Sequence, residues 1–194
     1  MANTETAVLT STAFERASAL TQVVTVMLFA SLTAVGAHII IPHQPVPYTL
    51  QSFFVLLAGG LLGKRNGSLS QLLYLSAGVA GLPFFSESGF GFARILGPTG
   101  GYLIGFPIAA FAVGYLLESR ASFLRSLLAI FIGVLIIFSL GTLQLNFTLV
   151  HNWSQSFMGG FLIFSWWDGL KLTAAAAIVS AVRGRRLHRS EKAA

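Results

Sequence analysis

The chain has 194 residues, of which 55% are hydrophobic and only 9% carry a charge, and its mean hydropathy is +0.77. Because a soluble domain carries about 25% charged residues, this composition excludes a water-soluble fold and predicts an all-α integral membrane protein. The net charge of +6 does not indicate a nucleic-acid partner, since five of the twelve basic residues cluster just after the last apolar stretch, where positive-inside charge is expected. The absence of cysteine excludes disulfides and thiolate metal sites.

The first segment, residues 1–18, is polar and contains Glu5 and Glu15. It lacks the basic start of a secretory signal, and the apolar segment after it is too long for a cleaved signal peptide. We therefore expect a short cytoplasmic segment that leads into the first membrane helix.

Long runs without any charged side chain follow, and they predict a six-helix membrane domain over residues 19–182. Each membrane-spanning helix needs about 20 apolar residues. The expected spans are 19–41, 48–63, 68–85, 99–117, 126–149 and 157–182. The second span is short and the third contains Gly78, Gly81 and Pro83, so tilted, kinked or partly re-entrant backbone is expected there.

Lysine and arginine divide unequally between the two sides of this domain. One side collects nearly all of them: Arg16, Lys64, Arg65, Arg120, Arg125, Arg183, Arg185, Arg186, Arg189 and Lys192. The other side, formed by the loops around 42–47, 86–98 and 150–156, holds only Arg94. The positive-inside rule then predicts that both termini are cytoplasmic, with a basic tail over residues 183–194.

Pairs of small residues four positions apart predict places where helices pack closely. Ala30 and Ala34 form such a pair on the first span, and Gly101 and Gly105 form one on the fourth. The alanine pair has two interpretations: packing inside the bundle, or contact with a second protein.

A carboxylate and an ammonium lie in the middle of the last apolar stretch, at Asp168 and Lys171. Each costs about 2.5–3.5 kcal/mol at the centre of a membrane helix, so such residues are rare and usually functional. Their spacing puts both on one face of a helix, close enough to pair. They form either a structural ion pair between packed helices or a polar clamp for a ligand.

Arg94 is the only basic residue in the glycine-rich outer loop. Its guanidinium suits a carboxylate, which it can hold through two parallel hydrogen bonds. The alternative is an arginine that faces solvent or lipid phosphate.

Three further segments carry a more specific pattern. They read Pro-Val-Pro-Tyr-Thr-Leu-Gln-Ser-Phe over 45–53, Gly-Ser-Leu-Ser-Gln-Leu-Leu-Tyr-Leu over 67–75 followed by Gly-Leu-Pro-Phe-Phe over 81–85, and Gly-Pro-Thr-Gly-Gly-Tyr-Leu-Ile-Gly-Phe over 97–106. Together with Asp168-x-x-Lys171, they resemble the BioY family, the biotin-specific substrate-binding (S) components of energy-coupling-factor (ECF) vitamin transporters. The likeness covers roughly residues 20–182, and Ser52 stands where the family usually has threonine.

The resemblance implies the six-helix fold of an S component, with a biotin pocket open to the outer face. It implies uptake of biotin across the cytoplasmic membrane without catalysis or cofactor in this chain. Its partners would be membrane lipid, a coupling membrane subunit that meets Ala30 and Ala34, and a pair of ATPases. A homo-oligomer is the alternative assembly if the chain acts alone.

The resemblance also suggests roles for individual residues. Asp168 would accept a ureido N–H of biotin while Lys171 donates to the ureido carbonyl, and Arg94 with Gln51 would hold the carboxylate. The apolar part of the ligand would meet aromatic residues. These are Tyr48 and Trp167, with Trp166, Tyr74 and the phenylalanines of loop 86–98 as further candidates. Another polar contact is expected from Gln71, Ser76 or Ser86.

Other functions fit the sequence less well. An S component for another vitamin would bind without selectivity for biotin. A membrane enzyme acting on a lipid-linked substrate would need clustered acidic residues at a cytoplasmic membrane edge, and a structural scaffold would leave Asp168, Lys171 and Arg94 without a shared role. The four histidines are scattered and predict no metal site.

Overall fold

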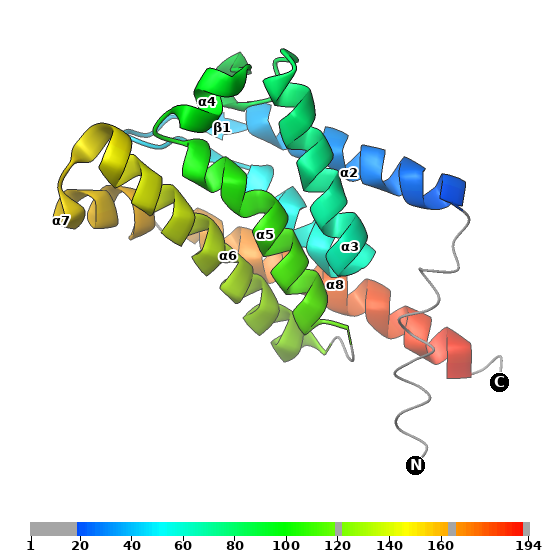
Figure 1. Cartoon of the computed structure of the whole chain (residues 1–194). Coiled ribbons are helices and arrows are strands. Elements are labelled where there is room, and N and C mark those ends of the chain that lie inside the picture. Colours follow the sequence, from blue (N-terminus) through cyan, green and yellow to red (C-terminus); the bar gives the residue numbers. More distant parts are fainter. Residues whose placement is uncertain (1–18, 119–121, 163–165, 192–194) are drawn as a thin grey trace.

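The computed structural model describes residues 19–118, 122–162 and 166–191, and nearly all regular structure in them is helical (Figure 1). Two predicted segments, 1–18 and the end of the basic tail, lie wholly or partly outside these residues. In chain order the elements are α2 (Ala19–His38), β1 (Ile40–Ile41), β2 (Tyr48–Thr49), α3 (Gln51–Val79), η1 (Ser86–Ser88), α4 (Phe92–Leu96), α5 (Gly100–Leu116), α6 (Phe123–Leu145), η2 (Asn146–Val150), α7 (Trp153–Ser156), η3 (Phe157–Phe161) and α8 (Trp166–Glu191).

The predicted second and third spans form the two arms of α3, which reverses direction at Gly63. This residue has φ 83° and ψ 177°, a conformation that side chains disfavour, and it is the one non-helical position in α3. Beyond the turn, a Cβ on Gly67 would lie only 2.8 Å from the Ala58 carbonyl oxygen, so the arms pack backbone to backbone. A single glycine therefore replaces the polar loop that the sequence suggested between two spans.

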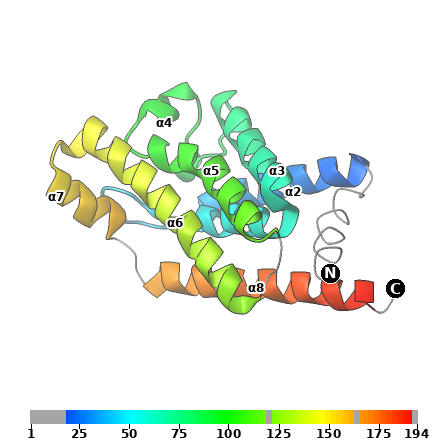
Figure 2. The same ribbon diagram turned by 60° about the horizontal axis from the view of Figure 1, so that its bottom comes forward.

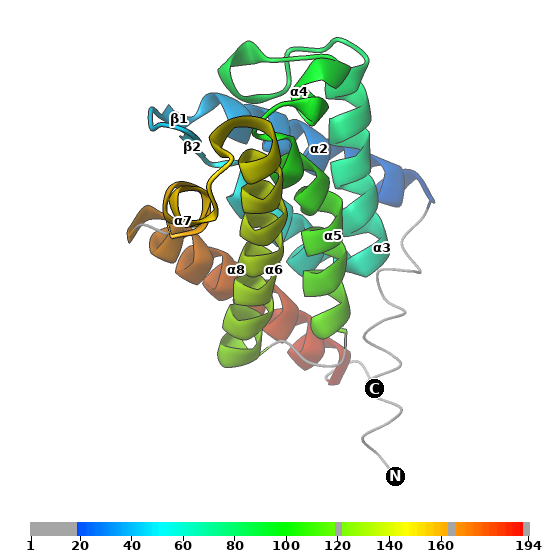
Figure 3. The same cartoon turned by 60° about the vertical axis from the view of Figure 1, so that its left-hand side comes forward.

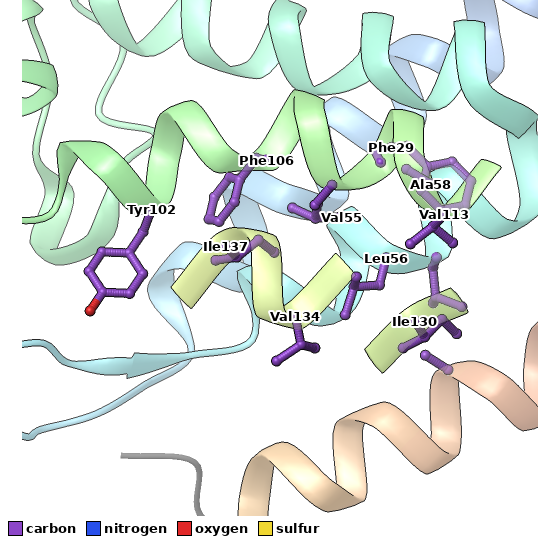
Figure 4. Packing of buried hydrophobic residues seen from close by; sticks show 14 of the residues in the cluster. Phe29, Val55, Leu56, Ala58, Tyr102, Phe106, Val113, Ile130, Val134 and Ile137 are labelled. Carbon is purple, nitrogen blue, oxygen red and sulfur yellow. The ribbon is translucent and has the colours of Figure 1, made fainter. Parts of the chain in front are cut away.

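The helices form one bundle around a shared apolar core. The arms of α3 pack on α2 and α5, α5 packs on α6, and α8 packs on α6 and α3. Figure 4 shows side chains from four of these helices pointing toward one another, among them Phe29, Leu56, Val113 and Ile130. Figure 2 shows α8 running along one side of the bundle, below α6.

Ala30 and Ala34 face this core in the described structure, while the contact with a coupling subunit stays a prediction. Their exposed fractions are only 4% and 6%. On the same face of α2, the Thr33 hydroxyl lies 3.3 Å from the side-chain oxygen of Gln71 on α3. Small side chains let α2 approach α3 closely, so in the chain by itself this face is used for packing inside the bundle.

The outer surface of the bundle is strongly apolar. Among the described residues, two helical stretches are by length and composition able to cross a membrane, Ala19–His38 and Phe123–Val150. Large apolar side chains stand exposed around the bundle, including Leu20, Phe111 and Leu128. A surface of this kind suits lipid and not water.

The last predicted span begins later than expected. Phe157–Phe161 forms a separate short helix, and α8 starts only at Trp166 and continues through the predicted boundary at residue 182. Asp168 therefore lies in the first turn of α8, where the positive end of the helix dipole favours a carboxylate, and not at the centre of a span.

The two ends of the bundle differ in charge and shape. At one end, α4, α7 and the β1–β2 pair gather, whereas the C-terminal end of α8 lies at the other (Figure 3). That second end holds the Lys64–Glu118 ion pair at 2.7 Å, the hydrogen bond from Arg125 to the Leu116 carbonyl, and one from the Arg183 guanidinium to the Leu117 carbonyl. Lys64, Arg125 and Arg183, which were predicted on one side of the membrane, thus lie at one end of the fold.

A polar-ended cavity between the helices

A cavity opens at the end of the bundle that carries α4 and α7. It holds about 700 Å³ of space that no protein atom fills, its open mouth included. Segments far apart in the sequence line it: Val46, Pro47, Tyr48, Thr49, Gln51, Ser52, Phe85, Ser86, Arg94, Thr99, Tyr102, Leu103, Phe106, Ile137, Phe138, Gly160, Asp168 and Lys171.

Asp168 and Lys171 form a buried ion pair on this cavity. Nζ of Lys171 lies 2.7 Å from Oδ1 of Asp168, and the two side chains are 7% and 6% exposed, respectively. The predicted pairing of these residues on one helix face is confirmed. Because both residues line the cavity, their charges can meet a ligand there.

The remaining contacts of Lys171 tie α8 to the start of α3. Its ammonium donates to the Thr49 carbonyl at 3.1 Å and to the Ser52 hydroxyl at 2.9 Å. An ammonium has three N–H donors, and Asp168, Thr49 and Ser52 account for all three. Donation from Lys171 to a ligand would therefore require the exchange of one of these bonds, whereas a carboxylate offers about four acceptor sites in all.

Arg94 also lines the cavity, but its guanidinium is held by its own loop. One nitrogen, Nη2, donates to the Ser86 carbonyl at 2.8 Å and to the Glu87 carboxylate at 3.1 Å. The side chains of Arg94 and Glu87 are 31% and 61% exposed. The absence of a side chain at Gly89 makes room for the guanidinium, because a Cβ there would lie 2.2 Å from Nε of Arg94. The pairing of Arg94 with Glu87 was not predicted from the sequence.

Gln51 lies in the first turn of α3, with 5% of its surface exposed. Its side-chain oxygen accepts from the Thr49 hydroxyl at 2.9 Å, and its amide nitrogen donates to the Tyr74 hydroxyl. Tyr48, on the neighbouring strand, also lines the cavity and packs its ring against His43 with centroids 4.9 Å apart.

The apolar part of the cavity wall comes mainly from residues that the sequence did not single out. Phe85, Phe106, Ile137 and Phe138 form this wall. Tyr102 closes it by donating a hydrogen bond of 2.9 Å to the carbonyl of Gly160. Figure 4 shows that Tyr102, Phe106 and Ile137 come from two neighbouring helices, α5 and α6. In the sequence, only the motif over 97–106 pointed to Tyr102 and Phe106 as residues of the site.

Several predicted residues lie away from the lining. Trp167 is half-buried beside Asp168 but is not among the residues that line the cavity, and Tyr74 lies behind it. Phe90 and Phe92 of loop 86–98 are each 60% exposed. Of the three candidates for a further polar contact, Ser86 lines the cavity, whereas Gln71 is buried against α2 and Ser76 is exposed. The side chain of Trp166 lies outside the described residues.

The arrangement suits an elongated ligand with two different polar ends. Its lining combines a carboxylate and an ammonium that form an ion pair, a guanidinium from a separate loop, and several aromatic rings. Within the described residues, no group of three His, Asp or Glu side chains comes together that could hold a metal ion.

Comparisons with known proteins agree on one family. A sequence model described as the BioY family matches residues 6–188. "Biotin transporter BioY" of Thermotoga maritima is 43% identical over 157 residues, which cover 81% of this chain and 92% of that protein. "Probable biotin transporter BioY" of Lysinibacillus sphaericus is 40% identical over 86% of both chains. In three dimensions, the crystal structure of "the S-component for biotin from an ECF-type ABC transporter" superposes with a TM-score of 0.78 at 26% identity, covering 85% of this chain and 92% of the other.

Proposed function

The chain belongs to the BioY family, and we propose that its cavity is the biotin site of an ECF-type S component. The chain is a biotin-specific uptake protein and not an enzyme. The observation that carries the assignment of the site is the ion pair between Asp168 and Lys171, buried and yet on the wall of the cavity. In a purely structural pair, no ligand-sized space beside the charges would be needed.

The chemistry of biotin matches the two ends of this cavity. Asp168 accepts a hydrogen bond from an N–H of the ureido ring. Lys171, which is bound to Asp168, Thr49 and Ser52, holds the Asp168 carboxylate in place. The thioether ring and the chain lie along Phe85, Phe106 and Phe138. At the other end, Arg94 and the Gln51 amide receive the carboxylate, as the sequence suggested. An analogue without the ureido group would leave buried polar groups unpaired, so selectivity is expected to be high.

The membrane topology follows from the charge distribution. Six spans are proposed: α2, the two arms of α3, α5, α6 and α8. Lys64, Arg125 and Arg183 lie at the end of the bundle opposite to the cavity. The positive-inside rule supports placing this end, and both termini, in the cytoplasm, which opens the cavity to the outside of the cytoplasmic membrane.

ATP-driven transport would need partner subunits, because the sequence has no phosphate-binding loop. The likeness to an S component supports a coupling membrane subunit with a pair of ATPases. A homo-oligomer is the alternative if the chain acts alone. Purification of the tagged chain from its native membrane, with identification of the co-purifying subunits, decides between these assemblies.

Equilibrium binding of labelled biotin to the purified chain tests the proposed function. We expect saturable binding of one ligand class that unlabelled biotin displaces and thiamine or riboflavin does not. Equal displacement by the other vitamins would point to an S component of different specificity, and absence of binding would contradict the proposal.

A further inference from the structure

A tyrosine that does not line the cavity joins three residues that do. Tyr74, on the second arm of α3, has no exposed surface. Its hydroxyl accepts a hydrogen bond from the Gln51 amide, and its ring makes an edge-on contact with Phe85 at 5.6 Å between centroids. The ring of Phe106 lies 6.3 Å from it. Polar and apolar parts of the cavity wall thus meet at one buried side chain.

The segment before α4 is fixed on the same tyrosine. The Tyr74 hydroxyl donates to the Phe84 carbonyl at 3.1 Å, and the rings of Tyr74 and Phe84 are nearly parallel, with 6.5 Å between centroids. One helical turn further, the ring of Phe85 fills the space beside Gly78, where a Cβ would lie 2.3 Å from it. Phe85 can therefore reach the cavity only in the position that this arm of α3 sets.

The two hydrogen bonds of Tyr74 also decide which way the Gln51 amide points. A phenolic hydroxyl has one proton, and the Phe84 carbonyl takes it, so the oxygen can only accept from Gln51. The NH₂ group must then face Tyr74, while the amide oxygen accepts from the Thr49 hydroxyl. Among the described residues, the second N–H of this amide has no partner, and it is the donor that remains for a ligand.

We infer that Tyr74 is a positioning residue for ligand binding, which acts through Gln51 and Phe85 without touching the ligand. The inference rests on the proposed function, because the ligand is taken to be biotin. Without the hydroxyl, the Gln51 amide loses its acceptor and is free to turn its oxygen toward the incoming carboxylate. An amide oxygen repels a carboxylate, whereas the N–H donates to it.

The variant Tyr74→Phe tests this role, because it removes the hydroxyl and keeps the ring contacts. We expect biotin to bind about tenfold more weakly, the loss expected when a buried polar group is left without its partner. Tyr115→Phe is the matched control, since Tyr115 is exposed and lies at the opposite end of the bundle beside Lys64. It should bind biotin as the unmodified chain does.

A double-mutant cycle separates positioning from a general loss of stability. In a Gln51→Leu background, adding Tyr74→Phe should weaken biotin binding clearly less than it does in the unmodified chain, because only the hydroxyl's bond to the Phe84 carbonyl is then left to lose. Equal weakening in both backgrounds, or unchanged affinity of the single Tyr74→Phe variant, would overturn the inference. Failure of the unmodified chain to bind biotin would instead refute the proposed function.

Should Tyr74→Phe not be recovered as folded protein, a label tests the same idea in a chain that keeps the hydroxyl. With 3-fluorotyrosine incorporated only at position 74, saturating biotin should move the ¹⁹F resonance, although the side chain does not line the cavity. A resonance that stays in place while biotin binds would contradict the inference.

Discussion

The two ion pairs on the cavity differ in rigidity. Asp168 and Lys171 are almost fully buried on one helix, and Lys171 is also bound to the start of α3. Arg94 and Glu87 are partly exposed and belong to a short loop segment. A buried pair in low dielectric has strong electrostatic contacts, whereas an exposed pair is weakened by water and salt. The first end is therefore suited to recognition of one chemical group, and the second to a carboxylate that enters from solvent.

Lys171→Met is expected to have the largest effect, because it leaves Asp168 buried without its counter-charge. Removal of one partner from a buried pair costs about 3–5 kcal/mol. We expect a lower melting temperature and a loss of biotin affinity of more than about a hundredfold. Lys64→Met is the control, since the Lys64–Glu118 pair is 41% exposed at the opposite end, and it should leave binding unchanged. Normal biotin binding by Lys171→Met would show that the buried pair matters no more for ligand recognition than an exposed one.

Asp168→Asn should have a smaller effect, because it keeps the size of the side chain and one acceptor oxygen. The ureido N–H then meets a neutral group, and we expect binding at least about tenfold weaker, or about 1.4 kcal/mol. The protein should remain folded. Titration calorimetry measures the change, and an unaltered affinity would eliminate Asp168 as a ligand contact.

Arg94→Ala should weaken biotin binding about five- to tenfold, since the variant loses a charge-assisted hydrogen bond to the carboxylate at a partly exposed site. Biotin methyl ester, which has no carboxylate, should bind the variant and the unmodified chain almost equally. Comparison of two proteins with two ligands isolates this contact. If both ligands lose affinity to the same extent, Arg94 organises the loop through Ser86 and Glu87 instead.

Glu87→Gln should have the smallest effect, at most about twofold at moderate salt, because the pair that it breaks is exposed. Removal of the competing carboxylate leaves Arg94 to the ligand alone, so biotin affinity should become more sensitive to added salt. Titrations at two salt concentrations measure this. A loss as large as that of Arg94→Ala would show that the ion pair is needed to shape the loop.

The polar ends of the cavity could be predicted from the sequence, whereas its apolar wall could not. Asp168, Lys171 and Arg94 are conspicuous because charged residues are rare in this chain. The wall is different, since the chain contains 17 phenylalanines and only tertiary packing brings Phe85 and Phe138 to the cavity. Composition does not show which of these phenylalanines line the cavity.

Helix boundaries and helix faces were predicted less well than helix existence. Hydropathy cannot locate the start of α8, because residues 157–167 are apolar or weakly polar on both sides of the break. It also cannot show that Gly63 turns the chain within one residue. Spacing placed Ala30 and Ala34 on one face of α2, but a pair of small residues does not specify which helix it meets, and the structure shows this face in the core.

The bonds of Lys171 have a consequence for biosynthesis. Its ammonium meets Ser52 and Thr49, which precede it by 119 and 122 residues. During translation the start of α3 therefore enters the membrane long before its partner on α8 exists, and the Asp168 carboxylate arrives together with that partner. A nascent chain that stops before α8 has neither charge of the pair, so it cannot hold the ligand by these contacts. The stabilisation that biotin gives through these contacts is consequently restricted to chains whose insertion has reached the last helix.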